Sequence, residues 1–444
     1  MMYFFDRFLV NFFVTYRFFV SRKYVDGDNR FIRERKMNLK EYITYVIIQR
    51  GNTNYSEAIK YFAGILRKDF ETITPQAIGK QRKYLLPNVY LDLSERFIDE
   101  LYGKFNGFST FKGYIIAACD GSIFQLPVDR KTREEMEIKK TTIFKKHNSR
   151  ARVSCILDVN SKHILTAKIA SKRIKETALA IEHLNNLKRR INIKKLITIY
   201  DRGYTSKELM VTTECMESKF IIRLKKNTFK NKIKRMNCDD GEIYINITKS
   251  VLDKITDETI KLQARKMGRI KIRIVKVKLK NDEIEILATN LSKEEFTSEE
   301  LKELYAKRWE IETGFDRLKN LIRIEDFSGR SRRLIEQDFY ANIFLYNLAN
   351  TIKIDSSKRI MRQPRKRKYE YKYVPNFSKI ISLMYFYIFD LISDPPVMKQ
   401  IIIDKIILDV AKNPTNVRID DERERKELVD STNSHNSYKK NPTI

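Results

Sequence analysis

The hydrophobic positions in the first hundred residues recur at helical spacing. Three stretches show this period, with apolar residues every three or four positions: NLKEYITYVIIQRG, NYSEAIKYFAGILRK and ITPQAIGKQRKYLLP. The connections between them are rich in Lys and Arg. The pattern predicts a helical N-terminal region over residues 1–105, and its basic connections suit DNA binding.

The opening twenty residues, MMYFFDRFLVNFFVTYRFFV, are more apolar than the rest of this region. Four polar residues interrupt them: Asp6, Arg7, Asn11 and Arg17. A signal sequence or a membrane-spanning helix needs a longer apolar run than these interruptions leave. We therefore expect an amphipathic helix packed on the rest of the protein, and no membrane partner.

After residue 105 the pattern becomes that of an α/β core. Apolar runs predict strands in YIIAACDGSIFQLP, ARVSCILDV and HILTAKIAS. The amphipathic stretch KETALAIEHLNNLKRR predicts a helix, and KKLITIYDRGYTS predicts a buried strand that ends at Asp201. A helix (SKELMVTTECM) and a strand (KFIIRLKK) follow. The predicted order is strand, strand, strand, helix, strand, helix, strand.

Residues 227–292 alternate with a period of two, which predicts a β-rich insertion with Lys and Arg on its exposed face. A long helix is expected over residues 298–321, and RLIEQDFYANIFLYNLANTIK predicts another. The polar C-terminal end is expected to be mobile. The predicted regions are 1–105 (helical, DNA-binding), 106–226 (core, first part), 227–292 (insertion), 293–355 (core, second part), 356–412 (helical) and 413–444 (mobile tail).

The long helix contains YAKRWEIETGFDRLK, which runs from Tyr305 to Lys319. At about 100° per residue, positions seven apart nearly eclipse one another. Tyr305, Glu312 and Lys319 are therefore expected along one side of the helix, with Arg308 beside them. A lone carboxylate between two cations and a phenol requires a functional explanation.

The net charge of +31, from 88 basic and 57 acidic residues, favours a polyanionic partner. Nucleic acid is the expected one, because displaced counterions make its binding to a basic protein favourable. The four cysteines are widely spaced, with no C-x-x-C, and form no zinc pattern with the four histidines. This spacing indicates a reducing, cytoplasmic environment.

Asp120 and Asp201 each end an apolar stretch and are followed by DGS and DRGY, so each is expected at the carboxyl end of a strand. Such ends converge on a crevice in an α/β sheet. Glu312 could complete a trio. Three ionised carboxylates repel one another unless divalent cations neutralise them, and oxygen-only ligands favour Mg²⁺, with Mn²⁺ as a substitute. Two such ions about 3.5–4 Å apart would suit phosphoryl transfer.

These residues resemble the signature of one insertion-sequence family of DDE transposases: Tyr, two residues, Arg, three residues, Glu, six residues, Lys (YREK). Tyr305, Arg308, Glu312 and Lys319 match every position. The flanking stretches CDGS, YDRGY, ATNL, RWEIE and EQDFYANIFLYNLA are also similar to this family. The resemblance covers about residues 105–355. It implies an RNase H-like mixed sheet flanked by helices and interrupted by the β-rich insertion, with helical N- and C-terminal regions.

The resemblance implies that Asp120, Asp201 and Glu312 are the catalytic triad and hold two Mg²⁺ ions. Tyr305, Arg308 and Lys319 would contact the transposon end. The implied activity is cut-and-paste transposition in the bacterial cytoplasm, at the nucleoid, by a dimer that holds terminal inverted repeats and target DNA. A hairpin intermediate is compatible with it. In this family an insertion residue can stack on an extruded base, and the aromatic candidates in this chain are Phe229, Tyr244 and Phe296.

Simpler interpretations remain open for single residues. Asp120 and Asp201 could be turn residues, and Arg308 with Glu312 has the spacing of an ordinary helical ion pair. Asp158, in ILDV, also falls on a predicted strand, and we interpret it as a supporting residue. Two other functions remain open: an RNase H-like nuclease or resolvase without strand transfer, and a non-catalytic DNA-binding derivative.

Overall fold

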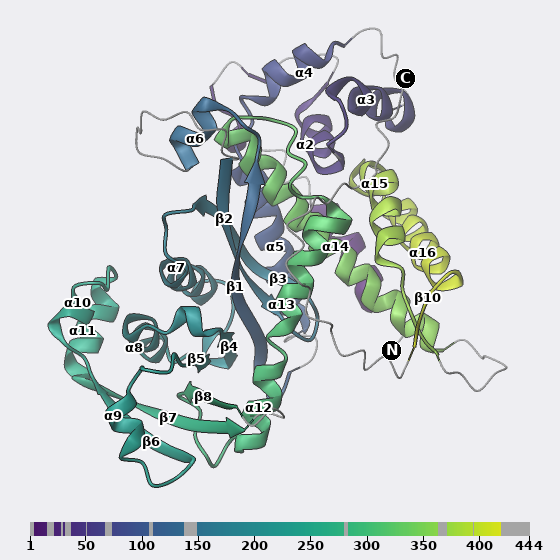
Figure 1. Ribbon diagram of the computed structural model, residues 1–444. Helices are drawn as coiled ribbons and strands as arrows, with labels where there is room; N and C mark the ends of the chain where they lie inside the picture. Colours follow the sequence, from purple (N-terminus) through teal and green to yellow (C-terminus); the bar gives the residue numbers. More distant parts are fainter. Residues whose placement is uncertain are drawn as a thin grey trace.

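The fold was described from a computed structural model of the chain (Figure 1). It describes residues 4–15, 22–27, 30–31, 37–49, 51–66, 73–105, 110–136, 149–278, 283–362, 371–393 and 395–418. Residues 363–370, within the predicted helical region 356–412, and most of the predicted mobile tail lie outside these residues.

A single eight-stranded mixed sheet organises the chain, in the order β3-β2-β1-β4-β5-β8-β7-β6. Its strands are β1 (Ile115–Leu126), β2 (Ser149–Asp158), β3 (Ile164–Ser171), β4 (Leu196–Tyr200), β5 (Lys219–Arg223), β6 (Asp240–Asn246), β7 (Arg269–Lys278) and β8 (Ile284–Thr289). β1 to β3 are antiparallel neighbours, whereas β4 runs parallel to β1 and β5 runs parallel to β4. This is the RNase H-like arrangement, so the predicted fold class and strand order are confirmed, with one extra helix, α6 (Arg130–Met136), between β1 and β2.

Helices cover both faces of the sheet because the central strands are apolar on both sides. Every residue of β4, LITIY, is buried. On β2, Arg152 points to α7 (Glu176–Lys188), whereas Leu157 lies against α13 (Trp309–Asp316). α8 (Lys207–Cys215) packs beside α7, and α14 (Arg332–Met361) contacts β3 (Figure 1). The core therefore lies in two layers, one on each side of the strands.

The insertion extends the core sheet. β8 pairs antiparallel with β5, and β7 and β6 follow outward from it. The β prediction is confirmed for these three strands, but the insertion also contains helices: α9 (Lys230–Lys234), α10 (Lys249–Leu252) and α11 (Glu258–Met267), with α11 packed on α8. Not all its basic residues are exposed, since Arg273 is buried and pairs with Asp240 at 2.7 Å.

The N-terminal region is helical, as predicted. It contains α1 (Phe4–Thr15), α2 (Leu39–Ile48), α3 (Asn54–Ile59), η3 (Lys60–Ile65), α4 (Pro75–Arg82) and α5 (Asn88–Phe105). Phe8 and Phe12 of α1 are buried, and Phe12 contacts Phe97 of α5 and Phe344 of α14 edge-on or tilted. The prediction of a packed amphipathic helix is confirmed. Among the described residues, no helix is both long and apolar enough to cross a membrane.

The C-terminal region contains α15 (Phe377–Ser393) and α16 (Pro396–Lys412), which pack on α14 and on each other. A short antiparallel pair of strands, β9 (Tyr371–Val374) with β10 (Thr415–Arg418), was not predicted. β10 falls within the predicted tail, whose mobility stays a prediction. The alternation of Asn and Arg with Val there is too short to be distinguished from a polar loop.

All four cysteines are free: Cys119, Cys155 and Cys215 are buried, and Cys238 is exposed.

Candidate active site

Two aspartates lie side by side where β1 and β4 separate. The parallel register pairs Cys119 of β1 with Tyr200 of β4, so Asp120 and Asp201 are the next residues on neighbouring strands. Neighbouring strands are about 4.8 Å apart. Asp201 lies between the end of β4 and a short 3-10 helix, η6 (Arg202–Tyr204). The convergence predicted for these two residues is confirmed.

The sequence predicted Asp120 at the end of its strand, but the structure places it within β1. β1 continues to Leu126 and keeps pairing with β2, for example Phe124 with Ala151. Only the pairing with β4 stops at Cys119. DGS resembles a turn in sequence, but here the antiparallel partner holds these residues extended. The crevice therefore opens on one edge of a strand that continues beyond it.

The helix expected over residues 298–321 is divided into three segments. They are α12 (Ser298–Ala306), α13 and a wider π-helical turn, η7 (Arg317–Ile322). Between α12 and α13 the backbone bonds tighten to three-residue spacing: Arg308 N–H donates to Tyr305 at 3.0 Å, and Ile311 N–H to Arg308 at 3.2 Å. Sequence periodicity does not reveal such a break, because residues 307 and 308 keep helical dihedrals.

Arg308 connects the helix to the two strands. Its guanidinium lies 2.9 Å from Glu312 Oε1 and 3.9 Å from Asp120 Oδ2, and its side chain is only 11% exposed. Burial lowers the pKa of Arg308, but the charges of Tyr305, Glu312 and Asp201 outweigh burial and raise it. Two of the predicted carboxylates therefore pair with the same guanidinium, and the charge of the third, Asp201, also acts on it.

The predicted phenol, Tyr305, lies at the same crevice. Its hydroxyl is buried and makes no hydrogen bond within the described residues. Burial raises its pKa to about 12, with the charge of Asp201 acting in the same direction and Arg308 opposing it. A neutral donor without a partner at a crevice can hydrogen-bond an incoming anionic oxygen.

The charge of the crevice is unbalanced. Burial raises the pKa of Asp120 to about 6; the charges of Glu176 and Glu312 add to this, whereas the Gly121 N–H and Arg308 oppose it. Asp120 Oδ1 accepts that N–H at 2.8 Å. One arginine thus faces more negative charge than it can neutralise.

The donors suit a hard divalent cation, because all are carboxylate oxygens and their charge is in excess. Across the described residues, however, no three Asp, Glu, His or Cys side chains surround a common point as metal ligands do. In this conformation the Arg308 guanidinium lies between Asp120 and Glu312. The residues fit the cation by their chemistry, and their assignment as metal ligands stays a prediction.

The family is shown by comparison with known proteins. A model described as the transposase DDE domain matches residues 111–348, more than half of the chain. The chain belongs to the transposase DDE domain family. DDE transposases are phosphoryl-transfer enzymes of DNA transposition and generally use divalent metal ions.

No curated protein matches the chain. Among solved structures, it is similar to a cryo-EM structure of a piggyBac transposase synaptic complex with hairpin DNA. The identity is 12%, the match covers 95% of this chain and 79% of that chain, and the TM-score is 0.40. A likeness at that score adds nothing to the family assignment.

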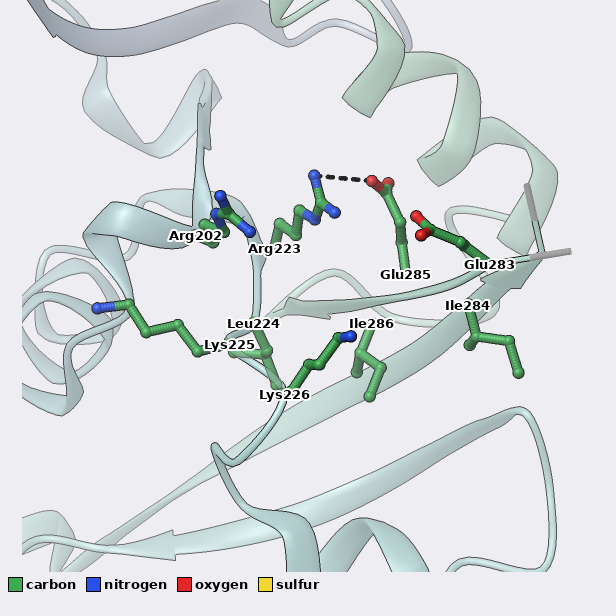
Figure 2. Close-up of a pocket in the computed structure, with 9 residues that line it drawn as sticks. All are labelled: Arg202, Arg223, Leu224, Lys225, Lys226, Glu283, Ile284, Glu285 and Ile286. Atoms are coloured by element: carbon green, nitrogen blue, oxygen red, sulfur yellow. Dashed lines mark ion pairs between the residues drawn. The ribbon is translucent and has the colours of Figure 1, made fainter. Parts of the chain in front are cut away.

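A basic groove adjoins Asp201 of this DDE transposase domain. Its volume is about 470 Å³, and it lies between η6, the segment after β5 and the start of β8. Figure 2 shows Arg223 pointing toward Glu285, with which it pairs at 2.8 Å. The side chains of Arg202, Lys225 and Lys226 line the same groove, and all three residues are exposed. A polyanionic strand near Asp201 would meet these cations.

Lys319 lies over the part of β1 beyond Asp120. Its Nζ donates to the Ile123 carbonyl at 3.1 Å and lies 4.9 Å from the centre of the Phe124 ring. Its predicted contact with DNA is not tested by these contacts. The backbone contact fixes the cation three residues along the strand from the aspartate.

One of the three aromatic candidates is excluded. Phe296 cannot stack on an extruded base, because it is completely buried against Phe111 and Tyr114. Trp309 is 51% exposed beside the Arg308 guanidinium. Tyr244 is 47% exposed, with Arg269 over its ring, whereas Phe229 is partly buried.

Asp158 is confirmed as a supporting residue. It is buried, accepts the Tyr102 hydroxyl at 2.7 Å and accepts the N–H groups of Asn160 and Ser161. It thus closes the turn between β2 and β3.

One acidic residue near Asp120 was missed. Glu176, at the first turn of α7, packs against Gly121 and Gly203. The sequence signal was present in KETALA and in the glycines that follow both aspartates. A glutamate at a helix start is common enough that the pattern alone does not identify a site.

Proposed function

We propose that the chain is a cut-and-paste transposase of the YREK-signature insertion-sequence family. The observation that carries this proposal is that Arg308 pairs with Asp120 and Glu312, while Asp201 follows the strand beside Asp120. The family assignment and the net charge of +31 support DNA as the substrate.

In this proposal Asp120, Asp201 and Glu312 hold two Mg²⁺ ions, for which Mn²⁺ can substitute. When bound, the ions supply the positive charge that stabilises the attacking and leaving oxygens of phosphoryl transfer. The reaction has two steps. Water first attacks the phosphodiester at the transposon end and the 3′-oxygen leaves. The freed 3′-hydroxyl then attacks a target phosphodiester, displacing its 3′-oxygen.

The remaining residues of the signature orient the DNA. The Tyr305 hydroxyl, which has no partner among the described residues, can donate one hydrogen bond to a phosphate oxygen, and Arg308 can give two parallel ones. Lys319 supplies a point charge beyond the cleaved bond, and the groove of Figure 2 supplies a basic path next to Asp201. These contacts position the strand without reading its sequence.

Cutting and joining at two ends require two active sites. We therefore infer that a dimer assembles on two terminal inverted repeats, in the bacterial cytoplasm at the nucleoid.

The test uses the full chain, a duplex carrying the element's terminal repeat, and a supercoiled target plasmid with Mg²⁺. The wild type should release a 3′-hydroxyl and join it to the plasmid. Asp120→Asn, Asp201→Asn and Glu312→Gln should each remove cleavage and joining, by a factor of about 10³ or more, while binding of the repeat persists. Cutting without any joined product would instead indicate a resolvase-like nuclease.

Glu310→Gln is the matched control. Glu310 lies on the same helix as Glu312 and also has one cationic partner, but this is Lys162 at 2.8 Å, away from the crevice. Its replacement should leave cleavage unchanged. Equal losses in Glu310→Gln and Glu312→Gln would remove Glu312 from the triad.

A further inference from the structure

Glu176 lies against the backbone beside both aspartates of the crevice. A Cβ atom on Gly121 would come within 3.2 Å of Glu176 Oε1, and one on Gly203 within 3.5 Å of Oε2. Gly121 follows Asp120 directly, and Gly203 is two residues after Asp201. One carboxylate therefore approaches both segments that carry the proposed ligands, tightly at Gly121 and at ordinary contact distance at Gly203.

Backbone conformation does not explain these glycines. Neither has the positive φ that favours glycine; that conformation is found at Gly27, Gly51, Gly113 and Gly268. At Gly121 the requirement is space, because 3.2 Å is too close for an ordinary side-chain contact. Gly121 has no side chain, and the Glu176 carboxylate occupies the space where one would lie.

Other residues fix Glu176 in this position. It is in the first turn of α7, where the helix dipole favours a carboxylate. Arg152 Nε lies 3.7 Å from Glu176 Oε1, and Arg152 Nη1 donates to the Ile174 carbonyl at 2.7 Å. Glu176 nevertheless keeps 34% of its side chain exposed. Its carboxylate is oriented but still accessible.

Glu176 approaches from the other face of the sheet. The register pairs Asp120 with Cys155 and Gly121 with Ser154, so the two β1 residues point to opposite faces. α13 brings Arg308 and Glu312 to the face of Asp120, whereas α7 brings Glu176 to the face of Gly121. At Gly121 the edge of β1 toward β4 is unpaired and carries no side chain, so groups from both faces of the sheet can approach each other there.

We propose that Glu176 is a fourth carboxylate of the divalent-cation site, reaching it past Gly121 and Gly203. This inference rests on the proposed function, which supplies the cation. Removing its charge should weaken cation binding even where the fold is intact.

The test measures Mn²⁺ binding by the full chain without DNA, from the loss of the free-ion electron paramagnetic resonance signal. Glu176→Gln should weaken Mn²⁺ binding roughly tenfold or more. Glu176→Asp keeps the charge on a shorter side chain and should recover part of the loss. Glu182→Gln is the control: Glu182 is on the same helix and pairs with Lys168 on the surface, so its replacement should change nothing.

Two glycine variants give a graded check. Gly121→Ala should displace the carboxylate and weaken Mn²⁺ binding, whereas Gly203→Ala makes only ordinary contact and should have a smaller effect. In a Glu176→Gln chain, Gly121→Ala should add little further loss, because the carboxylate it displaces is already gone.

The outcomes separate the two proposals when Asp120→Asn is measured alongside. Weaker binding in both Asp120→Asn and Glu176→Gln, at unchanged melting temperature, supports the inference. Loss in Asp120→Asn alone overturns the role of Glu176 and leaves the proposed function standing. No loss in either variant, or no Mn²⁺ binding by the wild type, overturns both. Loss in Glu176→Gln that only follows a lower melting temperature makes Glu176 structural and also overturns the inference.

Discussion

Two arginines, Arg82 and Arg308, contact polar groups from distant parts of the chain. They differ in whether the charges and hydrogen-bonding groups around them are balanced within the protein. Arg82 ends α4, and its Nε and Nη1 donate to Gln337 and Gln49, each at 2.7 Å. Its Nη2 pairs with Asp338 of α14, and both side chains are only 5% exposed. This contact joins the N-terminal helices to the core.

The Arg82 cluster is saturated. The other oxygen of Asp338 accepts the N–H and the hydroxyl of Ser328, each at 2.8 Å. One cation therefore meets one carboxylate, and the surrounding amides complete the bonding. Such a group has nothing left to offer a ligand.

The Arg308 cluster is the opposite case. One guanidinium pairs with Asp120 and Glu312 and also feels the charge of Asp201, while the Tyr305 hydroxyl has no partner in the described part of the chain. The contrast distinguishes structural charge from functional charge: the first is balanced within the protein, and the second needs something from outside. Four experiments test it.

The largest expected effect is at Arg82. Arg82→Met leaves the Asp338 charge buried without its cation and should destabilise the protein by about 3–5 kcal/mol. Guanidinium chloride unfolding measures this. The control, Arg332→Met, removes an arginine that is 53% exposed and should cost less than about 1 kcal/mol. If Arg82→Met lost as little unfolding free energy as Arg332→Met, burial of the Arg82–Asp338 pair would not contribute to stability.

Asp120→Asn should stabilise the metal-free protein. The folded pKa of Asp120, about 6, is above its ordinary value of 3.8. Its stabilising contribution is therefore complete below about pH 4 and lost as pH rises through 6. With Asp120 23% exposed, a stability gain of about 1–2 kcal/mol is expected for the variant at pH 8. Urea unfolding in EDTA between pH 4.5 and 8 measures it; a gain that does not grow with pH would contradict the argument.

Arg308→Met should cost about 1 kcal/mol in EDTA, because the carboxylates lose their internal cation. Millimolar Mn²⁺ should reduce this difference, since an added cation replaces the guanidinium charge. Thermal unfolding with and without Mn²⁺ makes the comparison. The same loss in both conditions would make Arg308 an ordinary helical ion-pair residue.

The smallest effect is expected at Lys319. If it contacts a phosphate, Lys319→Ala should reduce the salt dependence of repeat binding by up to about one unit of slope. Fluorescence anisotropy at several salt concentrations measures the slope. Lys194→Ala, which removes a surface partner of Glu217, should leave the slope unchanged. An unchanged slope for Lys319→Ala would mean that its role is the contact with Ile123.

The strand order and the position of Asp201 could be predicted from sequence because β4 is wholly apolar and ends abruptly at a charge. The helix break before Trp309 could not, because its residues keep helical dihedrals and only their hydrogen bonds change. Glu176 escaped notice for another reason. Its importance depends on two glycines that are 82 residues apart in the chain and approach the same carboxylate only in the fold.

The continuation of the sheet through β8 fixes when the crevice can be completed during synthesis. Asp120 and Asp201 precede the insertion in the chain, whereas Glu312 follows it, after the last strand of the insertion, β8, has been made. A nascent or prematurely terminated chain would carry two of the three acidic groups and the basic groove floor at Arg223 to Lys226. Under the proposed function, such a fragment would lack Glu312 and should not cut DNA.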